Sequence, residues 1–451
     1  MKHLIERSNY TLLHKLMLSR VLALKNHKGF KKYLFNTTWL FAERGLRVLS
    51  GILVGAWIAR YLGPGKFGVF SYVFAFTAIF AGIAKAGLDG IMVRELVNHP
   101  EKRSTYLGTA FWLKILGALS VMGLIAAIVP FTSNDATTNL FVFIVSGGLV
   151  FQSFEVIEFY FQSEVLARIV SICKVIQLAL SSMIKISLVF IEAELIWFVL
   201  VTSFDALTLA VSYFIAYQER KLPSFYKHFD FSIAKQLLKD SWPLIFSSIV
   251  VMIYMRIDQI MIKEILGEYQ VGIYSAAVRL GEAFYFIPTL ITASLFPAIL
   301  NAKNQSEELY KQRTQRLYVF VLWMAIAIAL PMTFLSDWLI LLIFGQAYQE
   351  AGQVLMVHTW ASIFVFLGVA SGKWYIIENL QRFNLINTIV GAILNVVLNL
   401  VFIPNFGVIG AAYTTLISYG VAAYLMSSIW KASRPNFLML SKSFLLFRNL
   451  R

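Results

Sequence analysis

The sequence predicts an all-α polytopic membrane protein with about twelve transmembrane helices, arranged as two parallel six-helix repeats around a central cavity. Three observations predict this fold: an apolar composition, a series of long apolar segments, and an internal repeat. Of the 451 residues, 59% are hydrophobic and only 14% are charged, whereas soluble domains have roughly 45–50% apolar and about 25% charged residues. A soluble chain of this composition could not cover its surface with polar groups.

Twelve segments are long enough to cross a bilayer, because a spanning helix needs about 20 mainly apolar residues. They are centred in 35–61, 67–92, 106–131, 139–161, 169–191, 195–217, 242–266, 271–299, 316–336, 353–376, 383–403 and 407–430. With a cytoplasmic N-terminus, the external linkers hold only Lys66 and Lys263, and the cytoplasmic linkers and tail hold many Lys and Arg residues. This asymmetry is typical of positive-inside topology, so we expect both termini in the cytoplasm. The net charge of +15 therefore indicates contact with membrane lipids and not with nucleic acid.

An internal repeat relates the two halves of the chain. Residues 62–71 read LGPGKFGVFS and residues 266–275 read LGEYQVGIYS, which aligns Gly63 with Gly267 and Gly68 with Gly272. Each copy lies in the expected turn between the first and second helices of a half. An even number of spans in each half gives both halves the same orientation, so the repeat axis lies along the membrane normal.

These boundaries divide the chain into five parts. We expect a basic amphipathic cytoplasmic segment at 1–33, an N-lobe at 34–217, a cytoplasmic linker at 218–240, a C-lobe at 241–430 and a basic cytoplasmic tail at 431–451. A disordered basic tail is the alternative for 1–33. The lone cysteine, Cys173, excludes an intrachain disulfide, and we expect no metal site.

Two stretches of the second half resemble a known family. They are RIDQIMIKEILGEYQVGIYSAAVRLGEAFYFIP (256–288), followed by SLFP (294–297), and LNVVLNLVFIPNFGVIGAAYTTLISYG (394–420). Both resemble the Wzx-type flippases of O-antigen and other polysaccharide repeat units, and LGPGKFGVFSYVFAF (62–76) matches the N-terminal turn of that family. The superfamily also contains the MurJ lipid II flippases and the MATE exporters. The resemblance covers residues from about 34 to 430.

The resemblance implies a function without catalysis. Such a protein moves an undecaprenyl-diphosphate-linked oligosaccharide from the cytoplasmic to the periplasmic leaflet of the bacterial inner membrane by alternating access between two lobes. Its partners would be that glycan lipid, membrane lipids, and the polysaccharide polymerase and glycosyltransferases of the same pathway. MurJ-like members use arginines on the first and eighth helices for the pyrophosphate, and Arg44, Arg47 and Arg279 are similarly placed here.

Charged residues inside the apolar segments are the candidate site. A charge near the bilayer centre costs several kcal/mol, so it faces protein or water and often marks a transport pathway. The proposed substrate-binding set is cationic, to pair with a diphosphate: Arg44, Arg47, Lys114, Lys185, Arg256, Arg279 and Lys373. The proposed gating or ion-coupling set is acidic: Glu43, Asp89, Asp258 and Glu282.

The alternative is that these charges pair and hold the bundle together. Glu43–Arg47 and Lys85–Asp89 at i,i+4, and Arg279–Glu282 at i,i+3, have the spacing for it. Lys114, Lys185, Arg256 and Lys373 have no opposite charge at these spacings, which favours the cavity. Polar stripes at helical spacing on the fourth, fifth and eleventh segments suggest water-lined walls; the last comprises Asn387, Gly391, Asn395 and Asn399.

Two other functions remain open from the sequence. One is a MATE-like ion-coupled exporter of small molecules, although a cation site needs an acidic lining. The other is a membrane-embedded polysaccharide polymerase or ligase, although no external linker is long enough for a catalytic domain. No cofactor is expected. The run around Gly65-Lys66 is not a P-loop, so a proton, sodium or lipid gradient would drive transport. His358 is either a proton-coupling group or a satisfied buried residue.

Overall fold

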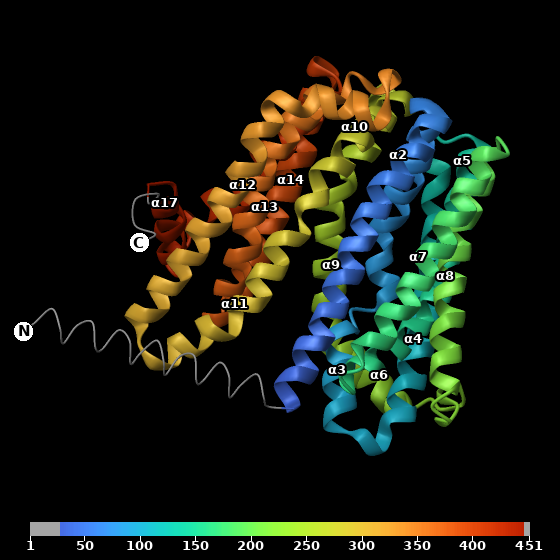
Figure 1. Cartoon of the computed structure of the whole chain (residues 1–451), viewed down its shortest axis with the longest axis vertical. Helices are drawn as coiled ribbons and strands as arrows, with labels where there is room; N and C mark the ends of the chain where they lie inside the picture. The colour runs from blue at the N-terminus through green and yellow to red at the C-terminus, as the bar shows by residue number, and fades with distance from the viewer. Residues whose placement is uncertain (1–27, 446–451) are drawn as a thin grey trace, which may run out of the picture.

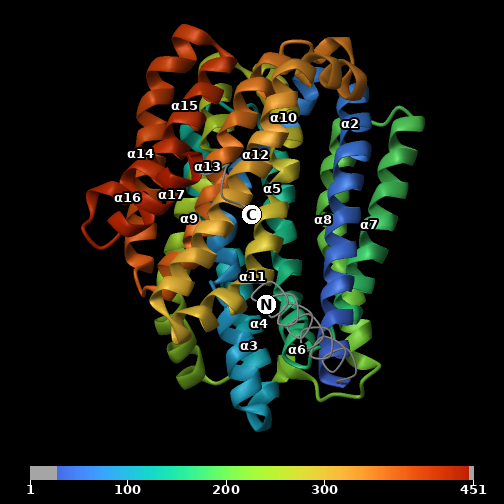
Figure 2. The ribbon, with the colours of Figure 1, turned by 60° about the vertical axis from the view of Figure 1, so that its left-hand side comes forward.

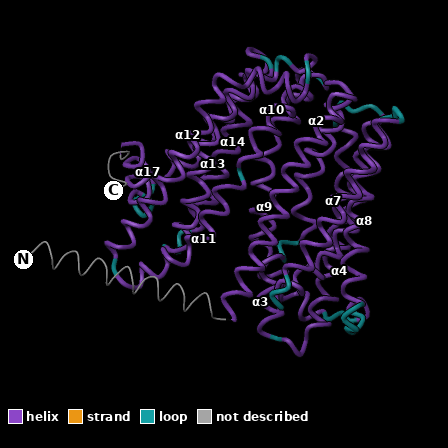
Figure 3. Tube along the Cα trace, viewed as in Figure 1, coloured by secondary structure: helices purple, strands orange, loops and turns teal. Residues whose placement is uncertain are grey.

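The computed structural model describes residues 28–445. Residues 1–27 of the expected N-terminal segment and 446–451 of the expected tail lie outside the described residues. Over 28–445 the backbone is helical with short connections and contains no β-strand, as Figure 3 shows. Eleven helical stretches in this range are long and apolar enough to cross a membrane.

The first of these stretches contains two spans. Helix α2 (Lys28–Lys85) has 58 residues, about 87 Å if it were straight, which is nearly three times the roughly 30 Å hydrocarbon thickness of a bilayer. The backbone leaves helical geometry at Gly63, with φ 71° and ψ 168°, and Pro64 follows. At this point α2 folds back on itself (Figure 1). Counting both arms gives twelve spans, which confirms the predicted all-α membrane fold with two six-helix repeats.

The remaining helices follow in two halves. The first half continues with α3 (Asp89–Asn98), α4 (Arg103–Ile128), α5 (Ala136–Phe151), the 3₁₀ turn η3 (Gln152–Glu155), α6 (Val156–Ser163), α7 (Ala167–Phe190) and α8 (Leu195–Gln218). The second half contains α9 (Phe231–Leu266), α10 (Glu268–Gly281), the 3₁₀ turn η5 (Glu282–Phe284), α11 (Phe286–Gln305), α12 (Glu307–Phe344), α13 (Ala351–Ile377), α14 (Gln381–Phe406), α15 (Val408–Gly420), the π turn η7 (Val421–Leu425), α16 (Met426–Ile429) and α17 (Arg434–Leu445).

The connection between the halves is shorter than the expected linker at 218–240. Helix α8 ends at Gln218 and α9 begins at Phe231, so residues 231–240 are already helical. Asp230 caps α9, since its carboxylate accepts a hydrogen bond of 3.0 Å from the amide of Ile233. An N-cap of this kind satisfies one of the amides that a helix start leaves free.

The second expected span is interrupted, which changes one predicted ion pair. Helix α2 ends at Lys85, and Ala86 (φ 53°) and Gly87 (φ 59°) take left-handed backbone conformations before α3 begins at Asp89. Lys85 and Asp89 therefore do not lie one turn apart on a helix. The predicted i,i+4 pair between them is wrong, and both side chains are exposed.

The two halves are joined at the end of the molecule where α2 turns at Gly63, here called the Gly63 end. Tyr348 donates a hydrogen bond of 2.7 Å to the carbonyl of Ala59, and Arg60 donates one of 3.3 Å to the carbonyl of Leu341. From the second half, the Lys263 ammonium lies 2.7 Å from both Ser133 Oγ and Asn134 Oδ1. Toward the other end, α11 diverges from the first arm of α2 in both views (Figures 1 and 2).

Candidate functional site

A polar cavity of about 590 Å³, here called the central cavity, lies between the two halves. Its walls come from the second arm of α2, from α7 and α8 in the first half, and from α9, α10 and η5 in the second half. Its charged lining residues are Lys185, Asp205, Arg256, Arg279 and Glu282. Three cations face two carboxylates, so the cavity carries net positive charge.

Arg279 is the cation of this cavity without a partner. Among residues 28–445 its guanidinium forms neither an ion pair nor a hydrogen bond. The group extends from α10 across to the first arm of α2 and lies against Gly55, where an added Cβ would come within 2.4 Å of Arg279 Cζ. A side chain at position 55 would occupy this space, so the glycine permits the arginine to reach across the interface. An unpaired guanidinium in a membrane interior is costly unless an anion or water satisfies it.

Arg256 and Glu282 form a bidentate pair across the cavity wall. Arg256 Nη1 and Nη2 lie 3.3 and 3.0 Å from the two carboxylate oxygens of Glu282. The predicted pairing of Glu282 with Arg279 is therefore wrong. The two terminal nitrogens of the Arg256 guanidinium, on the neighbouring helix α9, contact both carboxylate oxygens at once. This bidentate geometry favours the pair with Arg256 over a single contact between Glu282 and Arg279.

Lys185 also has a partner that lies on another helix. Its ammonium is 2.8 Å from Asp205 Oδ2 on α8 and 2.7 Å from Ser181 Oγ one turn away on α7. Ser181 and Lys185 belong to the polar stripe expected on the fifth span, and Lys185 lines the cavity. Asp205 is a site residue that the sequence pattern does not identify, because spacing within one helix cannot reveal a partner on the next helix.

A second cavity of about 260 Å³ adjoins the first and shares Thr202 and Asp205 with it. Arg47 lines this cavity and pairs with Glu43 at 2.7 Å, which confirms that predicted i,i+4 pair. Glu155, in the turn η3, also lines it and accepts a hydrogen bond of 2.9 Å from the buried Lys114. Lys114 is thus held in an ion pair behind the cavity wall, whereas the prediction placed it in the cavity lining.

Six predicted site residues line neither cavity: besides Glu43, Lys114 and Asp258, they are Arg44, Asp89 and Lys373. Arg44 is on the exposed face of α2, roughly 60° around the helix from Arg47. Asp89 is exposed at the start of α3. Lys373, on α13, holds its ammonium 5.4 Å from the ring centroid of Phe296 and lines neither cavity. The direction in which a charge points depends on how the helices pack, and a single-helix pattern does not give it.

Asp258 is buried in a separate polar cluster that joins four helices of the second half. Its carboxylate accepts hydrogen bonds of 2.6 Å from Tyr274, Thr415 and Asn399. Asn399 in turn contacts Asn395 at 3.1 Å. No cation pairs with this carboxylate among residues 28–445, and no group of three acidic, histidine or cysteine residues there could hold a metal ion.

The polar stripe of the eleventh span forms part of this buried core. Asn387, Asn395 and Asn399 on α14 are all buried, and Gly391 packs against Tyr254. The stripe does not line a water-filled wall, because its asparagines are buried, and Asn387 and Asn399 hydrogen-bond to groups on neighbouring helices. His358, on α13, is buried, and its Nδ1 has no hydrogen-bond partner among residues 28–445, so this nitrogen is not satisfied as the second interpretation of His358 requires.

Comparison with known proteins identifies the family. Residues 33–303 match the family model described as polysaccharide biosynthesis protein. The chain belongs to this family. Residues 243–401 also match the MatE model. Both matches confirm the resemblance to the oligosaccharide flippases and to the superfamily that includes MurJ and MATE proteins.

A relative and two solved structures extend the match over most of the chain. The probable flippase AglR of Haloferax volcanii is 25% identical over 411 residues, which cover 85% of this chain and 80% of that protein. A multidrug resistance MATE family transporter in an inward-facing conformation has a TM-score of 0.72 at 15% identity, covering 88% of this chain and 96% of that one. The lipid II flippase MurJ has a TM-score of 0.68 at 14% identity, covering 91% of both chains. These structures show a common fold.

Proposed function

We propose that this protein translocates an undecaprenyl-diphosphate-linked oligosaccharide repeat unit across the cytoplasmic membrane. The observation that carries the proposal is the unpaired guanidinium of Arg279, which lies in a cavity between the two halves. Arginine binds phosphate oxygens bidentately, and such pairs are stronger in a low-dielectric site than in water. Arg256 and Lys185 line the same cavity, and their carboxylate partners could release them to a more highly charged anion.

Movement would occur by alternating access. Contacts between the halves at the Gly63 end close that side, while α11 and the first arm of α2 diverge toward the other side (Figures 1 and 2). With both termini cytoplasmic, the Gly63 end faces the periplasm and this conformation accepts substrate from the cytoplasm. The two moving units would be the N-lobe at 34–217 and the C-lobe at 241–430, and the location would be the bacterial inner membrane.

A buried acidic site supports coupling to an ion gradient. The Asp258 carboxylate has hydroxyl and amide neighbours and no cation, so it could take up a proton or a sodium ion. Oxygen ligands from carboxylate, hydroxyl and amide groups suit a hard cation. Glu282 and Glu43 would act as gates, since each holds an arginine of a cavity. Asp89, which is exposed, has neither role.

A MATE-like exporter is the second candidate, and the match of residues 243–401 to the MatE model favours it. The excess of cations over carboxylates in the central cavity opposes it, because an organic cation would be repelled. The polymerase and glycosyltransferases of the pathway would be functional partners.

The proposal is tested in a host that lacks its own copy of this gene. Arg279→Ala should abolish surface polysaccharide while the amount of protein in the membrane is unchanged. Arg279→Lys should retain part of the activity, because charge remains while bidentate geometry is lost. Arg44→Ala is the matched control, since Arg44 is exposed and outside the cavities, and it should behave as wild type. Normal polysaccharide display by Arg279→Ala would contradict the proposal.

A further inference from the structure

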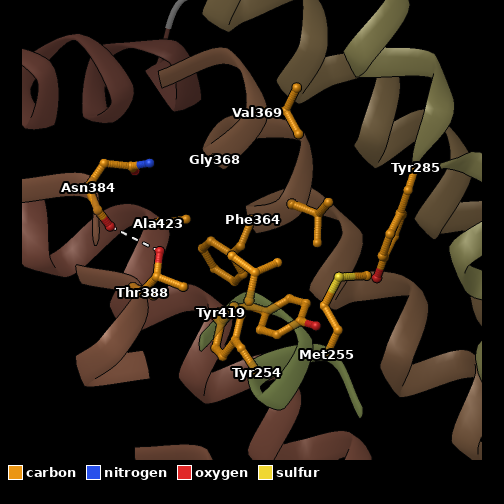
Figure 4. Close-up of a pocket in the computed structure, with 13 residues that line it drawn as sticks. Tyr254, Met255, Tyr285, Phe364, Gly368, Val369, Asn384, Thr388, Tyr419 and Ala423 are labelled. Carbon is orange, nitrogen blue, oxygen red and sulfur yellow. Dashed lines mark hydrogen bonds between the residues drawn. The ribbon is translucent and has the colours of Figure 1, made fainter. Parts of the chain in front are cut away.

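A third cavity lies inside the second half, beside the cavity that contains Arg279. It has a volume of about 260 Å³ and is walled by α9, α13, α14, α15, the turn η7, and Tyr285, which lies between η5 and α11. Figure 4 shows Asn384 and Thr388 on one side, Tyr285 on the other, and Tyr254, Tyr419 and Phe364 between them. None of the 13 lining residues is charged.

This cavity and the central cavity share two stretches of chain. On α9, Met255 lines the third cavity while the next residue, Arg256, lines the central one. Tyr285 lines the third cavity, and Glu282, one turn earlier, lines the central one. Three residues of a 3₁₀ turn such as η5 rise about 6 Å, so a group covalently linked to an anion at Arg256 and Arg279 would be close enough to enter.

The lining combines flat aromatic faces with a few polar atoms. The rings of Tyr254 and Tyr419 have centroids 4.5 Å apart at an angle of 36°. The buried hydroxyl of Tyr285 has no hydrogen-bond partner among residues 28–445. An unpaired buried hydroxyl is costly, and a ligand hydroxyl or amide would satisfy it. Aromatic surface with a small number of polar groups is typical of a ligand pocket.

From these contacts we infer that this pocket, the tyrosine pocket, holds the sugar directly attached to the diphosphate. A pyranose ring has an apolar face that stacks on tyrosine and hydroxyl groups that reach Tyr285, Asn384 and Thr388. A lipid tail would leave the buried Tyr285 hydroxyl unsatisfied, whereas the Thr388 hydroxyl already donates to the carbonyl of Asn384. The volume of about 260 Å³ lies just below the range of roughly 300–1,000 Å³ for drug-sized ligands, so it suits one sugar. With no cation in its lining, the pocket selects an uncharged sugar over a uronic acid. This inference rests on the proposed function.

Binding to the purified full-length protein in nanodiscs tests the inference. The probes are undecaprenyl diphosphate, the same lipid carrying one N-acetylglucosamine, and the same lipid carrying one glucuronic acid. We expect wild type to bind the N-acetylglucosamine form about tenfold more tightly than the bare lipid, and the glucuronic acid form no more tightly than the bare lipid. Tyr285→Leu and Tyr419→Leu should reduce the preference to within about twofold while affinity for the bare lipid stays constant.

Three controls make the result decisive. Binding of bare lipid by each variant shows that it is folded, and Tyr419→Phe, which keeps the ring, should retain most of the preference. Tyr269→Leu changes an exposed tyrosine at the Gly63 end and should change nothing. Wild type that binds bare lipid without a sugar preference, or leucine variants that keep the preference, would overturn the tyrosine pocket alone. Failure of wild type to bind the bare lipid would instead overturn the proposed function.

Discussion

Gly68 and Gly272 occupy equivalent positions in the two repeats, and each lies directly against the backbone of the other repeat. A Cβ at Gly68 would lie 1.8 Å from the carbonyl oxygen of Glu268, and a Cβ at Gly272 would lie 2.0 Å from that of Pro64. Pro64 and Glu268 are themselves equivalent, since each follows the turn glycine of its repeat. The contact is therefore reciprocal, like an interface on a two-fold axis. Only glycine permits this backbone approach, which closes the Gly63 end.

Gly68→Ala should weaken this closure and shift the protein toward a conformation open at the Gly63 end. Spin labels attached through Thr137→Cys and Gln349→Cys, at two positions exposed there, would report the shift as a longer distance between the halves. Gly65→Ala is the control, because it lies in the same turn and a Cβ there meets nothing within 4 Å. Equal distance distributions in both variants would refute the role of the glycine contact.

Gly55→Ala should impair transport, because it displaces the side chain of Arg279. The added methyl would come within 2.4 Å of Arg279 Cζ and would move the guanidinium out of the space between α10 and α2. We expect surface polysaccharide to fall by about tenfold, equivalent to a loss of about 1.4 kcal/mol in binding. Gly51→Ala, one turn earlier and without neighbours within 4 Å, should be silent. Wild-type activity of Gly55→Ala would show that the position of Arg279 is not critical.

Exchanging the charges of Arg256 and Glu282 distinguishes a gate from a binding site. Glu282→Gln leaves the partly buried Arg256 without its carboxylate partner, so the free energy of unfolding should fall by about 1–3 kcal/mol. The double variant Arg256→Glu/Glu282→Arg restores a pair and should recover that stability. It should recover transport too if the pair acts only as a gate, whereas transport should remain lost if Arg256 binds the diphosphate. Our account predicts recovered stability without recovered transport.

Asp258→Asn should remove ion coupling. Because the carboxylate receives three hydrogen bonds of 2.6 Å and lacks a cation, sodium binding there would stabilise the folded protein by mass action. Sodium should then raise the melting temperature of wild type and of the control Asp89→Asn, but not that of Asp258→Asn. If sodium has no effect on wild type, a proton is the remaining ion, and transport by wild type but not Asp258→Asn should depend on the pH gradient. Sodium stabilisation of Asp258→Asn equal to wild type would contradict the site.

The fold was predictable because it depends on signals that act over long segments. Twenty apolar residues identify a span whatever their neighbours are, and the repeat around Gly63 and Gly267 relates the halves. The repeated segment also lies at the interface between the two halves, because equivalent residues can touch only near the axis that relates the two repeats. Gly68 meets the second repeat there, and Ser71 and Ser275, another aligned pair, both line the central cavity.

The site was predictable only in part, because ion pairs between helices leave no mark on either helix alone. Arg279, Arg256 and Lys185 do line the central cavity. Arg256 pairs with Glu282, and Lys185 pairs with Asp205. In each pair the carboxylate lies on a different helical segment from its cation, whereas spacing rules apply within one helix. Arg44, Asp89 and Lys373 point elsewhere for the same reason, since interhelical packing decides which face of a helix meets the cavity.

The most direct test of the cationic cavity is transbilayer movement in proteoliposomes that contain only the purified protein. The substrate is undecaprenyl diphosphate carrying a fluorescent oligosaccharide, and its appearance in the opposite leaflet is followed by quenching. Wild type and Arg44→Ala should move the lipid at equal rates, Arg279→Lys should be slower, and Arg279→Ala should match protein-free vesicles. Movement by Arg279→Ala at the wild-type rate would contradict the claim that this guanidinium binds the diphosphate.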